Sequence, residues 1–402
     1  MKVRILNIGD EVLNGYVLNT NATYLASKVN ELGFTNSKIV IVKDDFKEIE
    51  SEVMSFLKTD EDILITTGGL GPTHDDITKE AIASALDLEM VYYEEIEKNL
   101  KEYLGDKFPT CNFKQAFFPK NSKLLNNKNG TADGAIIEKD NKIIIILVGP
   151  PAEMIPMFQD EVIPFLKTKY HSNELVKDFI IMGIAEALVD EKTQYLEEKY
   201  NLKIAAYVEC GYLRLQIRAK DENSFNKGVF EINNNLEKHI ISNNEIIEEV
   251  IVNKLLKFGY KLSFAESCTG GLLASSIINV SGSSAVLSES LICYSNEVKR
   301  SKLKVKKETL DKYGEISTEV AFEMAKGLFE TTNSHVCIST TGIAGPTNPY
   351  PNKSLGLICY SIKINEKYYN EEKTFKGNRN IVRLKASRWI LYRLFTLLKE
   401  KI

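Results

Sequence analysis

The sequence has few cysteines and no long apolar run, and each shortage excludes a class of protein. Its six cysteines are widely scattered and form no C-x-x-C pair, so we expect neither a disulfide framework nor a thiolate zinc site. No segment approaches the roughly 20 apolar residues that a membrane helix needs, and the best candidate, residues 143–148, is typical of a buried strand. The apolar N-terminal stretch is interrupted by Gly9-Asp10-Glu11, which argues against a signal peptide. We therefore expect a cytoplasmic protein that makes no membrane contacts.

An excess of charge of one sign is also missing. The chain has 51 Lys and Arg residues against 55 Asp and Glu residues, which gives a formal net charge of −4. This balance lacks the basic field with which proteins bind nucleic-acid phosphates, so we do not expect nucleic acid as a partner. Apolar residues make up 44% and charged residues 26%, which excludes a disordered or fibrous chain and favours globular domains.

The alternation of short apolar runs with helical patterns predicts three modules. Residues 1–170 follow a β-α-β-α-β-α order, which is typical of a parallel sheet covered by helices on both faces. Residues 171–244 have the pattern of a small α+β module. Residues 245–402 have that of a second α/β domain, which closes with a long helix over about residues 379–398. The expected fold class is therefore α/β.

Two loops of the first module lie just beyond the carboxyl ends of expected strands, where open α/β sheets bind ligands. The first contains Asp10 and Glu11, and the second, residues 66–76, is rich in glycine and ends in Asp75-Asp76. Glycines let the backbone approach a phosphate closely, and carboxylates beside a phosphate suggest a divalent cation between them. A plain strand-to-helix connection with Asp76 as the helix N-cap is the alternative explanation.

In the third module, Ser267 lies between an expected strand and an apolar helix, within residues 265–271. Backbone amides at a helix N-terminus can stabilise an oxyanion formed beside such a serine. The serine needs a base, and a Ser-His-Asp triad is not evident because all four histidines lie outside this segment. A lysine of lowered pKa is the other known partner. Ser267 as a simple N-cap and Cys268 as the nucleophile stay open as alternatives.

Three motifs of the first module, residues 8–11 with 19–21, residues 67–76, and residues 148–151 with 153–154, resemble those of the molybdopterin-binding-like domain of the CinA family (competence/damage-inducible protein A). The resemblance implies a three-layer α/β/α fold and metal-dependent hydrolysis of ADP-ribose to AMP and ribose 5-phosphate. It assigns the divalent metal ion, whose identity it leaves open, to Asp75, Asp76, Asp10 and Glu11. It assigns substrate binding to Gly68, Gly69, Gly71 and Asn21.

Four motifs of the third module, residues 266–271, 294–299, 314–317 and 341–346, resemble in the same order those of the CinA C-terminal domain, which is similar to nicotinamide-nucleotide amidases. The resemblance implies conversion of nicotinamide mononucleotide to nicotinate mononucleotide and ammonia, without a cofactor. It makes Ser267 the nucleophile, Lys299 the base and Tyr294 its hydrogen-bonding assistant. The residues it implies for substrate binding are Thr269, Gly270, Gly271, Thr341, Gly342 and Arg379, with Arg383 as an alternative to Arg379.

One loop departs from the family pattern. After Gly345-Pro346 the family continues with a Gly-Gly pair and a Lys-Pro-x-Gly turn, whereas residues 347–356 here keep only Lys353 and Gly356 of that pattern. The departure puts the shape of the loop and the affinity for substrate in question, so this loop is where an inactive amidase site would be explained first.

The middle module resembles the KH-like linker of full-length CinA proteins. It lacks the G-x-x-G loop with which KH domains clamp nucleic acid, because its glycines are isolated. We therefore expect a spacer or dimerisation module, and a homodimer. Two alternatives to a bifunctional enzyme stay open: a binding or regulatory protein of competence or DNA repair with one or both sites inactive, and a pterin-binding first domain.

Overall fold

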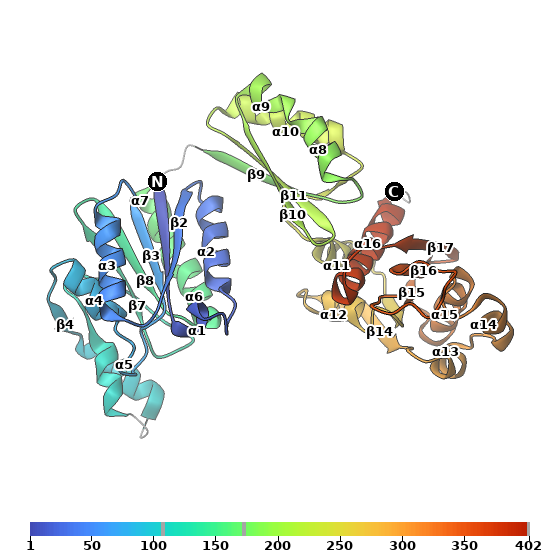
Figure 1. Ribbon diagram of the computed structural model, residues 1–402, viewed down its shortest axis with the longest axis horizontal. Coiled ribbons are helices and arrows are strands. Elements are labelled where there is room, and N and C mark those ends of the chain that lie inside the picture. Colours follow the sequence, from blue (N-terminus) through green and yellow to red (C-terminus); the bar gives the residue numbers. More distant parts are fainter. Residues whose placement is uncertain (106–108, 171–173, 400–402) are drawn as a thin grey trace. The chain divides into compact units, whose positions relative to one another are not determined.

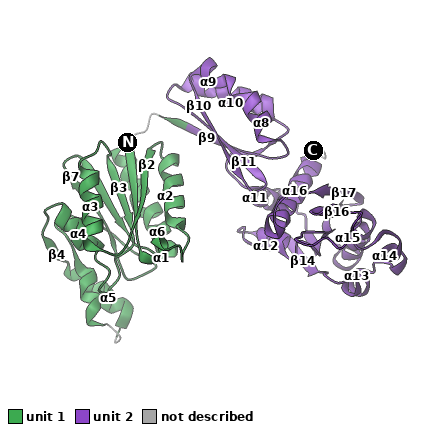
Figure 2. Ribbon diagram, viewed as in Figure 1, with its two compact units in different colours: residues 1–175 green, residues 176–402 purple. Residues whose placement is uncertain are grey.

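The computed structural model describes residues 1–105, 109–170 and 174–399. It divides into two compact units, residues 1–175 and residues 176–402 (Figure 2). The domain boundary expected at 170/171 falls beside residues 171–173, which lie outside the described residues. None of the helices in the described ranges has the length and apolarity needed to span a bilayer.

Unit 1 is a three-layer α/β/α domain built on a six-stranded sheet of order β2-β1-β3-β8-β7-β6. Figure 1 shows α3 and α4 on one face of the sheet and α2 and α6 on the other. Its strands are β1 Lys2–Ile8, β2 Thr35–Val42, β3 Ile63–Thr67, β4 Met90–Tyr92, β5 Phe117–Pro119, β6 Lys123–Leu125, β7 Gly134–Lys139 and β8 Lys142–Leu147. Its helices are α1 Asp10–Leu13, α2 Thr20–Glu31, α3 Phe46–Leu57, α4 Thr78–Ala85, α5 Glu94–Leu104, α6 Pro151–Met157 and α7 Ile163–Lys169, with a 3-10 helix at Thr110–Ala116 and a π-helical turn at Phe158–Val162.

The sheet is mixed, whereas the sequence predicted a parallel one. Strands β2, β1, β3 and β8 run parallel, but β7 and β6 run antiparallel at one edge. Asp140 and Asn141 connect β7 to β8 with φ angles of 50° and 63°. A two-residue turn with positive φ joins only antiparallel neighbours, so the close spacing of the two strands decides their direction.

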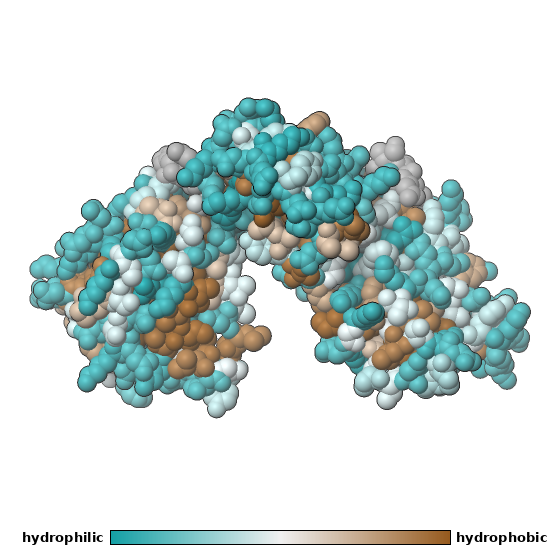
Figure 3. Space-filling view, turned by 45° about the horizontal axis from the view of Figure 1, so that its top comes forward, coloured by the Kyte–Doolittle hydropathy of each residue, from teal (hydrophilic) through white to brown (hydrophobic). Residues whose placement is uncertain are grey.

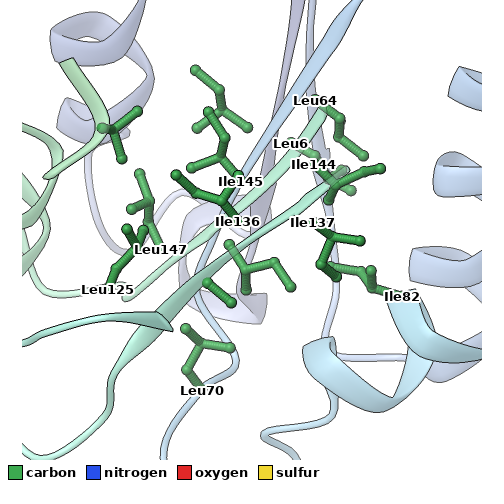
Figure 4. Packing of buried hydrophobic residues seen from close by; sticks show 14 of the residues in the cluster. Leu6, Leu64, Leu70, Ile82, Leu125, Ile136, Ile137, Ile144, Ile145 and Leu147 are labelled. Atoms are coloured by element: carbon green, nitrogen blue, oxygen red, sulfur yellow. The ribbon is translucent and has the colours of Figure 1, made fainter. Parts of the chain in front are cut away.

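Local sequence explains why these elements form. The Asp45 side chain accepts hydrogen bonds from the Lys47 and Glu48 amides (3.0 and 3.1 Å) and so caps the start of α3. Ile49, Val53 and Phe56 follow at helical spacing, and all three are fully buried. Strand β8 is buried on both faces, as the central strand of a covered sheet should be. Figure 4 shows the resulting core, in which its isoleucines meet side chains from β1, β3 and β7.

Unit 2 contains two sheets. The first has the order β10-β11-β9-β12, and the second, of order β14-β13-β15-β16-β17, is parallel at β14, β13 and β15 and antiparallel beyond. Its strands are β9 Leu175–Ile181, which begins at the unit boundary, β10 Lys203–Glu209, β11 Tyr212–Ala219, β12 Ile240–Ser242, β13 Leu262–Glu266, β14 Leu287–Ile292, β15 Val336–Gly342, β16 Leu357–Ile364 and β17 Lys367–Thr374. Its helices are α8 Glu186–Thr193, α9 Tyr195–Tyr200, α10 Glu222–Leu236, α11 Ile247–Phe258, α12 Leu272–Ile278, α13 Asn296–Leu303, α14 Lys307–Tyr313, α15 Thr318–Thr332 and α16 Arg379–Lys399, with a 3-10 turn at Ser283–Ala285.

The middle module and the C-terminal module share a hydrophobic core within unit 2. Ile180 and Met182, at the end of β9, belong to the same buried cluster as Leu391 and Tyr392 of α16. A Cβ on Gly183 would lie 2.3 Å from the Tyr392 hydroxyl, which shows how closely the two modules approach. The two modules thus pack as one compact unit, and their division at 244/245 stays a prediction.

Candidate active sites

The glycine-rich loop of unit 1 begins where β3 ends, and its first two residues must be glycines. Gly68 and Gly69 take positive φ angles of 103° and 66°. A Cβ would lie 2.1 Å from the Ile8 carbonyl oxygen at Gly68 and 2.2 Å from the Thr78 hydroxyl at Gly69. That hydroxyl donates a hydrogen bond to the Gly68 carbonyl (2.9 Å), which fixes the turn. At these two positions the loop therefore presents only its backbone to the adjoining pocket.

This pocket has a volume of about 380 Å3 and collects most of the residues expected at the first site. The carboxylate-bearing residues in its wall are Glu11, Asp44, Asp75, Asp76 and Glu153. Gly68, Gly69 and Gly71 line it as well, and Asn21 lines a neighbouring pocket of about 290 Å3, where its side-chain amide donates to the Gly149 carbonyl (2.7 Å).

Asp44 is a site residue that sequence reasoning missed. It is the second residue after β2, and its carboxylate accepts a hydrogen bond from the Asp10 amide (3.0 Å). Burial raises the pKa of Asp44, and the negative charges of Glu11, Asp10 and Asp75 raise it further. Asp10 itself is not among the described residues of the pocket wall. Its connection to the site is the hydrogen bond that its backbone amide donates to Asp44. The signal was the position of Asp44 at a strand's carboxyl end, which Asp10 shares.

Asp76 braces the loop instead of capping the next helix. Its Oδ2 accepts hydrogen bonds from the Thr73 amide (2.9 Å) and from the Thr73 hydroxyl. Helix α4 begins after Ile77 without any side-chain cap. The explanation of Asp76 as a helix N-cap is therefore wrong.

The carboxylates suit a divalent cation in chemistry but do not form a ready-made cage. Over residues 1–105, 109–170 and 174–399, no group of three or more His, Cys, Asp or Glu side chains is placed so that it would hold a metal ion. Magnesium-type ions are commonly held by one or two carboxylates together with substrate phosphates and water. The pocket fits that mode, in which the ligand completes the site, and does not fit an all-protein metal centre.

In unit 2, Ser267 follows β13 and lies at the floor of a second pocket. It is 7% exposed, and its amide donates to the Thr340 carbonyl (3.0 Å). The fully buried Glu266 accepts hydrogen bonds from the Leu273 and Ala274 amides (3.1 and 2.9 Å) at the start of α12. Ser267 therefore does not cap α12. Its hydroxyl bonds to no group in the described part of the chain, so it is free to meet a ligand.

Lys299, in α13, is the buried base candidate of the same pocket. It is 2% exposed, and its Nζ donates to the Tyr294 carbonyl (3.2 Å). Burial lowers the pKa of Lys299, while the negative charge of Glu315 opposes that shift. A lysine in this setting is neutral for a larger fraction of the time than an exposed one, which is what a general base requires.

Tyr294 and Arg379 form the outer edge of this pocket. The Tyr294 side chain is 65% exposed, and its phenol oxygen accepts a hydrogen bond from Arg379 (3.2 Å), whose other nitrogen donates to the Gly345 carbonyl (2.7 Å). Tyr294 thus contacts Lys299 through its backbone carbonyl and not through the phenol. Its expected role as assistant to the lysine stays a prediction.

The pocket has a volume of about 210 Å3 and brings together most of the predicted amidase residues. Those in its wall are Ser267, Tyr294, Lys299, Thr341, Gly342 and Arg379. Three other predicted residues, Thr269, Gly270 and Gly271, are not among its described lining. The buried Thr269 bonds to the Thr340 hydroxyl (2.8 Å), and its carbonyl accepts two hydrogen bonds from Arg383 (3.2 and 2.7 Å). Arg383 thereby supports the loop, which leaves Arg379 as the arginine of the pocket.

Two family models match this chain: the CinA C-terminal domain over residues 244–398 and a probable molybdopterin binding domain over residues 4–168. A relative from Thermoanaerobacter pseudethanolicus, which carries the name competence-damage inducible protein, is 42% identical over 400 residues and 96% of each chain. The chain belongs to the CinA family. A Clostridium botulinum relative of the same name is 42% identical over 395 residues, or 95% of this chain and 96% of its own. The crystal structure of CinA from Thermoplasma acidophilum is 28% identical with a TM-score of 0.39, over 42% of this chain and 96% of that one.

Membership of the CinA family confirms the resemblance drawn from the motifs, and two further site residues emerge from the structure. Glu315 and Tyr350 both line the pocket of unit 2, and the Tyr350 hydroxyl donates to the Glu315 carboxylate (2.5 Å). Glu315 lies in a motif that the sequence singled out, but its side chain had no assigned role. Tyr350 lies in the loop that departs from the family pattern. A contact between two loops 35 residues apart leaves no periodic signal in the sequence.

Cys268 lies beside Ser267 in the wall of the pocket but is poorly suited to act as the nucleophile. Burial raises the pKa of its thiol to about 12. The thiolate is the reactive form of cysteine, and it is scarce at neutral pH with such a pKa. No histidine occurs in the described lining of this pocket, so a serine-lysine arrangement is the one its residues offer.

Proposed function

We propose that the pocket of unit 2 hydrolyses the carboxamide of nicotinamide mononucleotide to nicotinate mononucleotide and ammonia. The observation that carries the proposal is the pairing of an unengaged serine hydroxyl with a buried lysine of lowered pKa in the wall of one pocket. These are the two groups that a serine amidase without a histidine requires.

The proposed reaction uses side chains of this chain and one water molecule. Neutral Lys299 takes the proton from Ser267 as the serine oxygen attacks the carboxamide carbon, and the resulting lysine ammonium returns a proton to the departing nitrogen. Ammonia leaves, and an acyl ester remains on Ser267. Lys299 then activates water, which cleaves the ester to the carboxylate and restores the serine. Arg379, at the outer edge of the pocket, supplies the positive charge for the 5′-phosphate.

Ammonia release from nicotinamide mononucleotide tests this proposal. We expect turnover by the full chain, a loss of at least about a hundredfold in Ser267→Ala and in Lys299→Met, and unchanged turnover in Asp75→Asn, whose side chain belongs to unit 1. A protein that releases no ammonia at any pH from 6 to 10 would refute it.

A second activity, hydrolysis of ADP-ribose to AMP and ribose 5-phosphate, is supported by the pocket of unit 1. The exposed backbone of Gly68 to Gly71 would bind the diphosphate. One or two of the wall carboxylates of Glu11, Asp44 and Asp75 would hold a divalent cation together with the substrate phosphates. Such a cation would neutralise the charge of the phosphates and orient the leaving group. Water adds to one phosphorus, and the bridging oxygen leaves with the other phosphate.

Formation of AMP with and without divalent metal tests the second activity. Asp75→Asn and Asp44→Asn are expected to reduce it strongly, while Ser267→Ala leaves it unchanged. The family model for this region is described as a molybdopterin binding domain, so retention of a pterin without any AMP formation would favour pterin binding instead. Absence of both turnovers, with a protein partner that co-purifies, would favour a regulatory role.

A further inference from the structure

The loop that departs from the family pattern, residues 347–354, is a fixed wall of the amidase pocket. The Tyr350 amide donates to the Asn348 side chain (3.0 Å), and the Lys353 amide donates back to the Tyr350 carbonyl (3.0 Å). The Lys353 ammonium donates to the carbonyls of Tyr313 (3.3 Å) and Ile316. The first two bonds shape the loop itself, and those of the Lys353 ammonium attach it to the segment that carries Glu315.

Glu315 and Tyr350 lock each other in position at the pocket surface. One carboxylate oxygen of Glu315 accepts from the Tyr350 hydroxyl (2.5 Å), the other accepts from the Asn296 amide (2.6 Å), and its backbone carbonyl accepts from the Thr341 hydroxyl (2.7 Å). The Tyr350 ring also packs against the buried cluster that contains Ile316 and Cys359. The hydrogen bond to the carboxylate raises the pKa of Tyr350 to about 12, so the phenol keeps its proton at neutral pH.

The charges in the pocket give this pair a chemical meaning. Among the described lining residues, Glu315 is the one with a carboxylate, and Lys299 and Arg379 are the ones with cationic side chains. The face of a tyrosine ring attracts a cation, and a nearby carboxylate adds to that attraction. The pyridinium ring of an oxidised nicotinamide nucleotide is planar and positively charged, so both of its properties match this wall.

We infer that Glu315 and Tyr350 form a subsite for a cationic heteroaromatic ring and determine which nucleotides the pocket accepts. The inference rests on the proposed amidase function and adds to it the feature of the substrate that is recognised. The ring packs on Tyr350 near the carboxylate of Glu315, which leaves the carboxamide to face Ser267. A nucleotide with the same ribose phosphate and carboxamide but an uncharged ring should bind less tightly.

Nicotinamide mononucleotide and its reduced, uncharged dihydropyridine form provide that comparison. Binding of both is measured by calorimetry on the Ser267→Ala chain, in which the amide is not cleaved. We expect the oxidised form to bind about tenfold more tightly. Adding Glu315→Gln or Tyr350→Ala should reduce the preference to threefold or less. Tyr313→Ala, which removes a tyrosine outside the described pocket wall, should leave it unchanged.

A spectroscopic signature separates the ring from the hydroxyl. Pyridinium protons that lie over a tyrosine ring shift upfield in NMR spectra, so the shift should persist in Tyr350→Phe and disappear in Tyr350→Ala. Glu315→Gln removes the charge while it preserves the size of the side chain. The intensity and wavelength of Trp389 fluorescence show whether each variant is folded.

The outcomes distinguish the subsite from the proposed function. If the wild-type chain releases ammonia and binds the oxidised nucleotide, but both variants keep the full preference, the subsite is refuted alone. If neither ammonia release nor binding of the oxidised nucleotide is found, the proposed function and the subsite fall together.

Discussion

Replacement of Gly68 by alanine is expected to destabilise unit 1 and to close its pocket. The φ angle at Gly68 is 103°, and an added Cβ would lie 2.1 Å from the Ile8 carbonyl oxygen, which is backbone and cannot rotate away. Gly15 is the matched control, since its φ is 75° but nothing lies within 4 Å of an added Cβ. The two substitutions share the cost of a left-handed backbone and differ in the steric contact.

Two energetic costs give the expected loss in the free energy of unfolding for each substitution. A left-handed conformation costs an L-residue about 1–2 kcal/mol, and a forced contact adds about 1–3 kcal/mol. Gly15→Ala should therefore lower the free energy of unfolding by about 1–2 kcal/mol and Gly68→Ala by about 2–5 kcal/mol. For a unit of this size each kcal/mol moves the melting temperature by about 2–4 °C, so the shifts are about 2–8 °C and about 4–20 °C.

Thermal unfolding of the full chain, followed by circular dichroism, measures these shifts. Trp389 is the single tryptophan and lies in α16, so its fluorescence follows unit 2 separately and should be unchanged. Ammonia release should also be unchanged, while AMP formation from ADP-ribose is lost. A Gly68→Ala chain that is no less stable than Gly15→Ala would show that the close approach to Ile8 is not present in the protein.

Three further substitutions test other parts of the structure. Glu315→Gln removes a negative charge that raises the pKa of Lys299, so the neutral lysine forms at lower pH. The rising limb of the pH profile of ammonia release should therefore move to lower pH. A limb that moves to higher pH or stays in place would contradict this. Cys268→Ser should retain ammonia release within about threefold, because a thiol with a pKa raised to about 12 by burial is not the nucleophile; a loss as large as that of the serine variant would reverse that assignment. Arg4→Met leaves the buried carboxylate of Glu61 without its ion-pair partner. The free energy of unfolding, measured with urea, should fall by about 3–5 kcal/mol. A fall of less than about 1 kcal/mol would indicate that the other hydrogen bonds of Glu61 suffice without the arginine.

The gathering of the predicted amidase residues was expected from the family resemblance, and the strand order explains it physically. Ser267 follows β13, Tyr294 follows β14 closely, and Thr341 lies near the end of β15. These are three adjacent parallel strands, whose carboxyl ends meet at one edge of the sheet. The strand order therefore explains why motifs separated by up to 74 positions line one pocket. In unit 1 the carboxyl ends of the expected strands had already indicated that the Glu11 loop and the glycine-rich loop bind a ligand.

Features made by contacts between irregular segments could not be predicted in this way. Strand β17 was missed because its sequence, Lys367 to Thr374, is rich in charge and one of its faces is exposed, which resembles a loop more than a strand. Asp44 was missed because it belongs to neither of the two loops that the sequence singled out, although it too lies just beyond the carboxyl end of a strand. The bond between Glu315 and Tyr350 depends on how two loops pack, for which no spacing in the sequence gives a signal.

Two of the amides at the start of α12 are not free for the oxyanion expected beside Ser267, and only the structure reveals the reason. Amides at the start of α12 were expected to stabilise a negative charge beside Ser267, but those of Leu273 and Ala274 already donate to the carboxylate of Glu266. Because Glu266 is fully buried and its carboxyl oxygens accept both bonds, these two amides are already engaged in the folded protein. Any oxyanion formed at Ser267 therefore depends on other donors of the pocket wall. Amides that lie in that wall and donate to no group in the described part of the chain include those of Cys268, Ala344, Gly345 and Thr347, and an oxyanion would rely on donors of this kind.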